Sequence, residues 1–510
     1  MFRNYLNVAI RNILKHKFFS FINIIGMTIG ITACLLIVIY INDELSFDRF
    51  HAHADRIYQV DLHGRIAGQE INTANTCPPM AQALVADLPE VEAATRLRAL
   101  YGMSVKNEDK IFTEENVFFA DSNFFQFFSF KLLMGDAQTA LLEPNSVVVT
   151  EDIAKKYFDS NSPVGKLLVI GNENKTYKVT GVAENPPFNS HFRFNMLISA
   201  SGDDGMRSSV WVNNFLYTYY RLRPNTSAKE VDAKFLGIVE KYVGPEIERF
   251  LQTTLKELRA KGDNYGFYST ALTDIHLHAT VSDGLSPGGN ISYIYFFAAI
   301  GVFIITIACI NFMNLATARS ASRAKEVGLR KTLGSLRSQM VVQFLAESTL
   351  YSLVAVAFAL AACYFVLPKF NLLAGKTLTM AVVATPEFIG GLVALVIVVG
   401  LVAGSYPAFY LTSFNAVEVL KGKVRAGMKS KGIRSTLVVF QFGLSIFLII
   451  FTLVVYQQIS FMQNVQLGMD KNNVLVIRGT DRLGANKEAF RNSLSQQQGI
   501  EKTSYTNNVF

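Results

Sequence analysis

The chain has 510 residues, of which 50% are hydrophobic and only 17% are charged, and this balance excludes a disordered or fibrous protein. The net charge of +8 is concentrated in three short stretches, residues 1–17, 317–340 and 412–436. Because these stretches together carry more positive charge than the whole chain, the remainder is acidic overall. The basic residues therefore mark membrane topology by the positive-inside rule, and nucleic acid is excluded as a partner.

Five apolar runs are long enough to cross about 30 Å of hydrocarbon. We expect membrane spans at residues 19–41, 293–315, 344–367, 388–411 and 437–456. Alternation then places the N-terminus in the cytoplasm, residues 42–292 and 457–510 outside, and the basic connections 316–343 and 412–436 inside. The sequence thus predicts a multi-pass protein of the cell inner (plasma) membrane.

The N-terminal residues 1–18 precede the first span. Apolar residues recur there at helical spacing with basic residues between them, which predicts an amphipathic helix on the inner membrane surface. A helix that only orients the first span explains the same pattern. The first span itself is a retained anchor rather than a signal peptide, because its apolar stretch is too long and no small-residue cleavage site follows.

The exported region, residues 42–292, has the pattern of an α+β domain. We expect two β-α-β halves, with strands at residues 56–62, 91–97, 215–222 and 271–278 and helices at 78–87 and 227–242. A strand-rich unit at 145–182, with a helix at 151–158, is inserted between them. Cys77 is the lone cysteine of this region, so no disulfide is possible within it.

Five stretches, spread in order along nearly the whole chain, carry a family resemblance. Residues 311–348 (NFMNLATARSASRAKEVGLRKTLGSLRSQMVVQFLAES) and 404–422 (GSYPAFYLTSFNAVEVLKG) resemble the permeases of FtsX/MacB-type ABC transporters. Residues 145–170 (NSVVVTEDIAKKYFDSNSPVGKLLVI) resemble the MacB periplasmic core domain, as do FDRFHAHADRIYQV after the first span and LTDIHLHA before the second. The implied fold is an α-helical membrane protein with a MacB-like α+β extracytoplasmic domain inserted between transmembrane helices 1 and 2.

The resemblance implies a type VII ABC transporter subunit, in which a separate ATPase drives cytoplasmic coupling elements and moves the extracytoplasmic domain. Residues 320–333 have the pattern of a short polar helix ended by a glycine, with Val327 and Leu329 able to pack and with Glu326, Arg330 and Lys331 displayed to the cytoplasm. A solvated basic loop that only fixes topology is the alternative. The expected ATPase-coupling residues are Arg323, Glu326, Gly328, Arg330, Leu333 and Gly334.

We expect no catalytic, cofactor-binding or metal site in this chain. SNSPVGKLL at residues 160–168 imitates a P-loop, but Ser160 stands where glycine is needed and Leu167 where Ser or Thr is needed. His51, His53, His276 and His278 flank the exported region without cysteine partners, which argues against a zinc site. The HExxH motif is absent, which argues against a membrane-bound enzyme.

The near absence of charge inside the spans favours a permease that works by moving its exported domain, in efflux or mechanotransmission. Glu347 is the one charged residue of the five runs, and its position predicts that it reaches the cytoplasmic interface. The alternative function is a non-transporting FtsX-like regulator of an extracytoplasmic hydrolase or a peptide-sensing complex. Expected partners are an ABC ATPase subunit that binds the ATP, membrane lipid, an outer-membrane or periplasmic protein, and a second permease half in a dimer or pseudo-dimer.

After the fourth span the chain repeats the order of its own beginning: a basic approach, an outward span, a strand-like NNVLVIRG at residues 472–479 and a helix-like segment at 487–497. We therefore expect residues 457–510 to be the truncated start of a second extracytoplasmic domain within a duplicated permease of eight spans. A five-span protein whose short tail pairs with a partner is the competing interpretation.

Overall fold

The computed structural model describes residues 2–66, 68–159, 162–171, 173–318, 320–413, 430–465, 473–477 and 480–506. These residues form two compact units, one comprising Met1–Leu45 with Ile291–Val465 and the other Ser46–Asn290 with Gln466–Phe510. Most of the predicted basic connection 412–436 lies outside the described residues.

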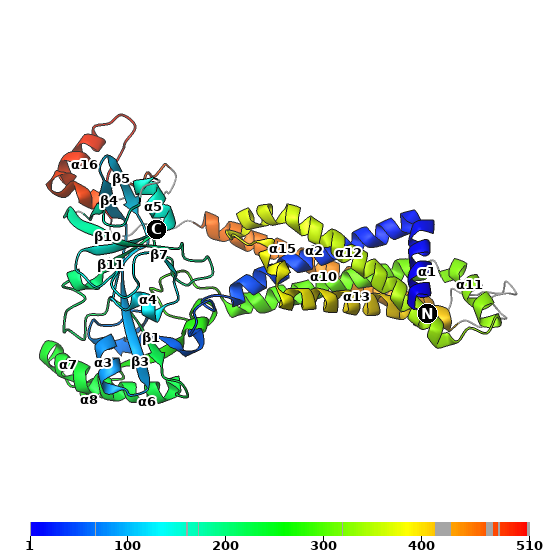
Figure 1. Cartoon of the computed structure of the whole chain (residues 1–510), viewed down its shortest axis with the longest axis horizontal. Helices are drawn as coiled ribbons and strands as arrows, with labels where there is room; N and C mark the ends of the chain where they lie inside the picture. Colours follow the sequence, from blue (N-terminus) through cyan, green and yellow to red (C-terminus); the bar gives the residue numbers. More distant parts are fainter. Residues whose placement is uncertain are drawn as a thin grey trace. The chain divides into compact units, whose positions relative to one another are not determined.

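The first unit is helical. Its elements are α1 (Phe2–Lys15), α2 (Lys17–Leu45), α10 (Ile291–Ala318), α11 (Ser320–Thr332), α12 (Arg337–Ala374), the 3-10 turn η5 (Met380–Ala384), α13 (Pro386–Thr412) and α15 (Ser430–Asn464). Among the described residues, α2, α10, α12, α13 and the Arg434–Asn464 part of α15 are long and apolar enough to cross a membrane. Figure 1 shows α2, α10, α12 and α13 running side by side. These four helices contain the first four predicted spans, and α15 contains the fifth.

Small residues set the close approach of the helices in this bundle. A Cβ atom on Gly30 of α2 would lie 2.8 Å from the Ala308 Cβ of α10, and one on Gly400 of α13 would lie 2.5 Å from the Thr349 Cα of α12. Glycine at these positions lets the helix backbones touch, as in other membrane helix pairs. Helix α15 packs on α10, where the Asn314 Nδ2 donates to the Gln441 Oε1 at 3.3 Å.

The second unit is built on a mixed sheet. Its strands are β1 (Ile57–Ile66), β2 (Gln69–Thr73), β3 (Val91–Leu100), β4 (Met103–Asn107), β5 (Lys110–Glu114), β6 (Val117–Ala120), β7 (Leu132–Met134), β8 (Ser146–Thr150), β9 (Leu167–Ile170), β10 (Lys175–Ala183), β11 (Met196–Ser199), β12 (Tyr217–Leu222) and β13 (Asn264–Ala271). The strand order is β13-β1-β12-β3-β6-β11-β8-β10-β9-β4-β5, with β2 paired to β1 and β7 to β10. The α+β prediction is confirmed.

The two β-α-β halves interleave rather than lie beside each other. β1 and β3 of the first half both pair antiparallel with β12 of the second, and β12 and β13 of the second half both pair antiparallel with β1. Interleaving of this kind is the split β-α-β arrangement. The inserted unit at residues 145–182 continues the same sheet. β3 pairs with β6, β6 with β11, and β11 with β8, the first strand of the inserted unit.

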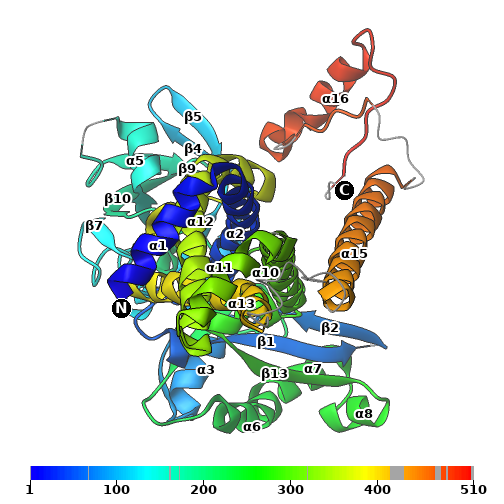
Figure 2. The same cartoon turned by 90° about the vertical axis from the view of Figure 1, so that its right-hand side faces the viewer.

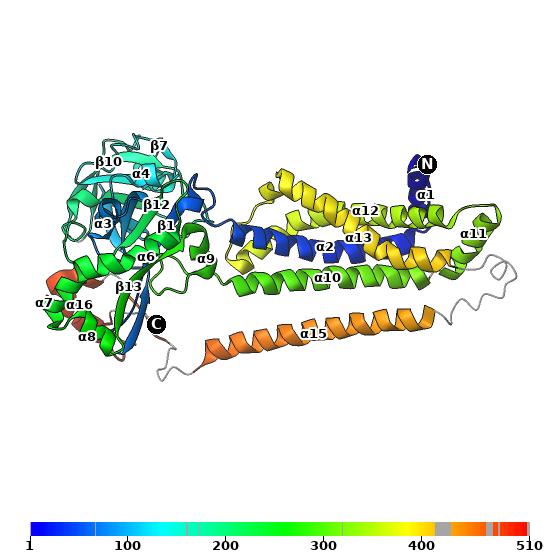
Figure 3. The same cartoon turned by 90° about the horizontal axis from the view of Figure 1, so that it is seen from below.

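Helices cover this sheet and close its core. They are α3 (Met80–Asp87), α4 (Phe124–Phe127), α5 (Glu151–Phe158), α6 (Ala228–Ile238), the π-helical turn η3 (Val239–Val243), α7 (Gly244–Leu251), α8 (Leu255–Ala260) and α9 (Ile275–His278), with 3-10 turns η1 (Ala54–Arg56), η2 (Ala200–Gly202) and η4 (Leu272–Asp274). Figure 3 shows α6 alongside β1 and β13. Cys77 is fully buried beside this helix layer, and burial raises the pKa of its thiol to about 12.

Two predicted strands are wrong. Residues 271–278 were expected to form a strand, but the strand β13 ends at Ala271 and the next residues form η4 and α9. Residues 473–477, the described part of the predicted strand 472–479, form no strand. The later segment does contain η6 (Thr480–Asn486) and α16 (Lys487–Ser495), so the helix predicted at 487–497 is confirmed over most of its length.

Candidate functional site

The predicted coupling segment forms helix α11, which follows α10 after a single undescribed residue. The helix ends as the sequence predicts. Gly334 takes a left-handed conformation with φ of +89°, its N–H donates to the Lys331 carbonyl at 3.1 Å, and the Ser335 N–H donates to the Arg330 carbonyl at 3.0 Å. This pair of bonds is a Schellman motif, which needs glycine at the left-handed position. Arg323 lies on α11, but its side chain is outside the described set.

Side chains of the last two turns fix α11 to α12. Glu326 and Arg330 form an ion pair of 2.7 Å one helical turn apart, and the Arg330 Nη1 also donates to the Gln343 Oε1 at 2.5 Å. Val327 is 3% exposed and Gly328 is buried, so this face of the helix is packed. Three of the predicted residues, Glu326, Gly328 and Arg330, therefore lie together where α11 meets the membrane helices.

Lys331 was expected to face the cytoplasm, and it does not. Its Nζ donates to the carbonyl of Thr412, the last residue of α13, at 2.8 Å. The Arg337 Nε donates to the Thr412 Oγ1 at 3.5 Å. A cation at a helix C-terminus satisfies an orphan carbonyl and interacts favourably with the helix dipole. Burial, with a smaller contribution from Arg337, lowers the pKa of Lys331.

The outward tip of this segment is apolar. Leu333 is 78% exposed and Leu336 is 62% exposed, and both belong to the turn between α11 and α12. Leu329 was expected to pack, but it is 54% exposed, because Val327 occupies the inward position of that turn. Exposed leucines beside an ordered ion pair form a surface suited to a protein partner. Sequence reasoning missed Leu336, although its spacing from Leu329 and Leu333 is a signal that could have found it.

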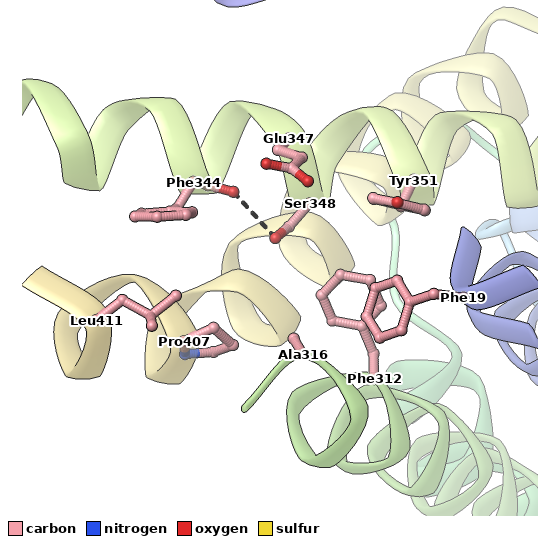
Figure 4. A pocket seen from close by; sticks show the side chains of 9 residues that line it. All are labelled: Phe19, Phe312, Ala316, Phe344, Glu347, Ser348, Tyr351, Pro407 and Leu411. Atoms are coloured by element: carbon pink, nitrogen blue, oxygen red, sulfur yellow. Dashed lines mark hydrogen bonds between the residues drawn. The ribbon is translucent and has the colours of Figure 1, made fainter. Parts of the chain in front are cut away.

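A pocket lies under α11, lined by Asn12, Glu326, Val327, Arg330, Met340, Gln343 and Phe344. Asn12 comes from α1, so three helices meet at this point. A second pocket, shown in Figure 4, continues along α12 and is lined by Phe19, Phe312, Ala316, Phe344, Glu347, Ser348, Tyr351, Pro407 and Leu411. The two pockets share Phe344.

Glu347, which was predicted to reach the cytoplasmic interface, is only 4% exposed, because neighbouring helices enclose its side chain. The Asn12 Nδ2 donates to its Oε2 at 3.4 Å. Nearby, the hydroxyls of Ser20 and Tyr351 are 2.8 Å apart, and the Ser20 Oγ donates to the Ile13 carbonyl at 3.1 Å. These bonds tie α1 and the start of α2 to α12.

The opposite end of the bundle has its own clamp. The Lys376 Nζ, in the loop after α12, lies 2.6 Å from the Glu44 Oε1 and 2.9 Å from the Asp43 Oδ2 at the end of α2. The Asn371 side chain holds this loop by donating to the Leu378 carbonyl at 2.8 Å and accepting from the Leu378 N–H at 3.1 Å. Burial acts to lower the pKa of Lys376, but bonds to the two carboxylates outweigh it and raise the pKa overall.

The four histidines that flank the exported region have separate roles. The Ser129 N–H donates to the His51 Nδ1 at 3.0 Å, and the Arg56 Nη2 lies 3.1 Å from the His53 Nδ1. His276 stacks on Phe47, and the His278 Nδ1 lies 3.6 Å from the Asp274 Oδ1. Burial lowers the pKa of His51 to about 4, which keeps the ring neutral. In the described part of the chain, no group of three or more His, Cys, Asp or Glu side chains could hold a metal ion.

Comparisons with known proteins match two parts of the chain. Residues 20–237 match the MacB-like periplasmic core domain family, and residues 298–416 match the FtsX-like permease C-terminal family. The macrolide export ATP-binding/permease protein MacB of Bdellovibrio bacteriovorus is 24% identical over 279 residues, which are 54% of this chain and 38% of that protein. The uncharacterized ABC transporter permease YknZ of Bacillus subtilis is 21% identical over 439 residues, which are 82% of this chain and 98% of that one.

Two solved structures are also similar. A domain of a permease protein from Porphyromonas gingivalis is 24% identical, with a TM-score of 0.37, and the match covers 43% of this chain and 91% of that domain. The periplasmic region of MacB from Actinobacillus actinomycetemcomitans is 13% identical, with a TM-score of 0.28, and the match covers 42% of this chain and 90% of that region.

Proposed function

Because this chain is an FtsX/MacB-like ABC transporter permease, we propose that it couples ATP hydrolysis on a separate ATPase subunit to motion of its exported α+β domain. The observation that carries the proposal is the build of α11. Its inward face is bonded to α12 through Arg330 and to α13 through Lys331, while its apolar tip at Leu333 and Leu336 is exposed.

A helix held in this way acts as a lever. Force applied to the exposed tip is passed to α12 and α13 together, since Arg330 bonds to α12 and the adjacent Lys331 bonds to α13. The close contact of α13 with α12 at Gly400 leaves little room for the helices to slide. At the other end of the bundle, the ion pairs of Lys376 connect the α12–α13 loop to the end of α2, so displacement of the loop moves that end. The exported domain begins directly after α2 in the chain.

This arrangement favours a function based on motion of the exported domain over transport of cargo between the membrane helices. Glu347 is the single charged residue of the five apolar runs, and it is buried among helices α1 and α12 in a mainly apolar pocket. A path for polar cargo needs a continuous series of polar groups or water. We therefore propose efflux or mechanotransmission that is carried out by the exported domain outside the bilayer and driven through α11, with the N-terminus and α11 on the cytoplasmic side.

The test reverses the ion pair of α11. In Glu326→Lys with Arg330→Glu, the attraction between the two residues is kept, but the charge at each of the two positions changes sign. We expect the ATPase subunit to be lost from the full chain on affinity purification in detergent, or its ATP-dependent activity to be uncoupled. The matched control is Glu151→Lys with Lys155→Glu, an ion pair of the same spacing on α5 of the exported domain. Undiminished ATP-dependent activity of a normally assembled α11 variant would contradict the proposal.

A further inference from the structure

Helix α1 lies across the end of the helical bundle. The chain turns at His16, between Lys15 at the end of α1 and Lys17 at the start of α2. Figure 2 views the bundle from its end, and α1 extends across that view while α2 is seen nearly along its axis. If α2 spans a bilayer, α1 therefore runs along the membrane surface on the side of α11.

One face of α1 is held by protein. Ala9 is 2% exposed, Asn12 bonds to Glu347 of α12, and the carbonyl of Ile13 accepts from Ser20. This face is therefore covered by α12 and the first turn of α2. Because this face of α1 is held against the bundle, the residues on its other faces point away from the bundle.

The face of α1 beside the covered one carries an apolar strip that continues into α2. Ile10 is 41% exposed, Leu14 is 62% exposed and Phe18 is 78% exposed. Ile10 and Leu14 are four apart, so they lie above one another on one face of α1. Phe18 follows in the first turn of α2. Phe21 and Ile25 of α2 are also exposed, which makes the strip continuous with an apolar surface of the spanning helix.

Basic residues border the apolar strip. Arg11, Lys15 and Lys17 are all exposed, and the first 17 residues contain no Asp or Glu. An apolar strip bordered by cations is the arrangement that binds helices to membrane surfaces rich in anionic lipid. A protein groove would cover the leucine and phenylalanine as well, but it would not require the strip to continue along α2.

We propose that the outward face of α1 binds anionic phospholipids, with Ile10, Leu14 and Phe18 inserted among the acyl chains and with Arg11, Lys15 and Lys17 at the phosphate groups. This surface goes beyond the coupling function, because it involves neither α11 nor the ATPase. It has a consequence for the site, since Asn12 on the other face of α1 lines the same pocket as Glu326 and Arg330. Lipid bound to α1 thus stabilises the wall against which α11 is seated.

The test measures lipid selectivity of the full chain. The protein in a neutral detergent is titrated with phosphatidylglycerol and, separately, with phosphatidylcholine of the same acyl chains, and bound lipids are counted by native mass spectrometry. We expect a preference for phosphatidylglycerol of about threefold or more, weakening as salt is added. The variant Arg11→Gln with Lys15→Gln and Lys17→Gln should lose this preference.

Two controls make the result specific. Lys106→Gln with Lys178→Gln and Lys256→Gln removes the same charge from exposed positions of the exported domain and should keep the preference. Arg11→Lys with Lys15→Arg and Lys17→Arg keeps the charge of α1 and should keep it as well, which separates charge from folding. An unchanged preference in the α1 glutamine variant overturns the proposal. Loss of a bound protein from that variant, with lipid preference unchanged, overturns it too and assigns the face to a protein partner.

Discussion

The ring of Phe47 stacks on the imidazole of His276, with centroids 3.5 Å apart and planes inclined by 3°. Phe47 comes two residues after α2 ends, and His276 lies in α9, shortly before the chain enters α10. The pair thus joins the two segments through which the exported domain is connected to the membrane helices. The Gly289 N–H donates to the His276 carbonyl at 2.6 Å, which holds the second segment in place.

Removing the ring of Phe47 should destabilise the exported domain. We expect Phe47→Ala to lower its free energy of unfolding by about 3 kcal/mol, because a buried aromatic ring and its stacking contact with His276 are both lost. Trp211, the single tryptophan of the chain, is 6% exposed and reports this unfolding by fluorescence in urea with the full chain in detergent. Phe250→Ala, at a ring that is 56% exposed, is the control. Equal effects of the two substitutions would show that the stack contributes nothing.

The stability of the exported domain should depend on Asp61 below neutral pH. Burial raises the pKa of this carboxyl to about 6, despite bonds from Thr270 and Gln59, whereas the unfolded value is 3.8. Between these two values the folded state holds a proton that the unfolded state lacks, so this residue adds stability as pH falls from about 6 to about 4. The gain is at most about 3 kcal/mol. Comparison of wild type with Asp61→Asn, by Trp211 fluorescence across this range, should show it. A constant difference between the two proteins would refute it.

His51 should have the opposite effect. Its folded pKa is about 4 against an ordinary 6.5, so below 6.5 the unfolded state binds a proton that the folded state excludes. Stability is therefore lost as pH falls from 6.5 to about 4. In His51→Asn the amide oxygen can still accept from the Ser129 N–H, but the titration is gone. We expect this variant to resist acid better than wild type, and identical acid unfolding curves would be evidence against a buried neutral ring.

The contact between α12 and α13 should depend on two glycines. A Cβ atom on Gly404 would lie 2.6 Å from the Ser348 Oγ, and one on Gly400 would lie 2.5 Å from the Thr349 Cα. Alanine at either position must push the helices apart, at a cost of about 1–3 kcal/mol. Gly390→Ala and Gly391→Ala are matched controls on the same helix, since nothing lies within 4 Å of a Cβ atom there. Thermal inactivation in detergent measures the effect, and equal melting of all four variants would remove the glycine contact from the account.

Much of the fold follows from local patterns. The limits of α5 and the glycine end of α11 were predicted closely, because capping and periodicity depend on neighbouring residues. The strand predicted at 271–278 failed because ALTDIHLH is short, and apolar spacing in so few residues fits a helical turn as well as a strand.

The candidate site was only partly predictable for a different reason. Glu326, Arg330, Leu333 and Gly334 were found by pattern, but Asn12 meets Glu347 across 335 positions of sequence. Lys331 similarly reaches Thr412, which is 81 positions away. Nothing in the spacing of one helix indicates which distant carbonyl or carboxylate its cation or amide will meet. These contacts depend on how the helices pack.

The most direct test of the central claim asks what α11 touches in the cell. A photo-crosslinking amino acid is placed at Leu333, whose side chain is 78% exposed, and the crosslinked partners of the full chain are identified by mass spectrometry. Leu373, which is 88% exposed at the other end of α12, is the control position. We predict that an ABC ATPase subunit is crosslinked from Leu333 and is absent from the crosslinks of Leu373. Crosslinks from Leu333 only to lipid or to unrelated proteins, in cells where the ATPase still co-purifies with the chain, would contradict the claim that this helix is where ATP hydrolysis is coupled to the permease.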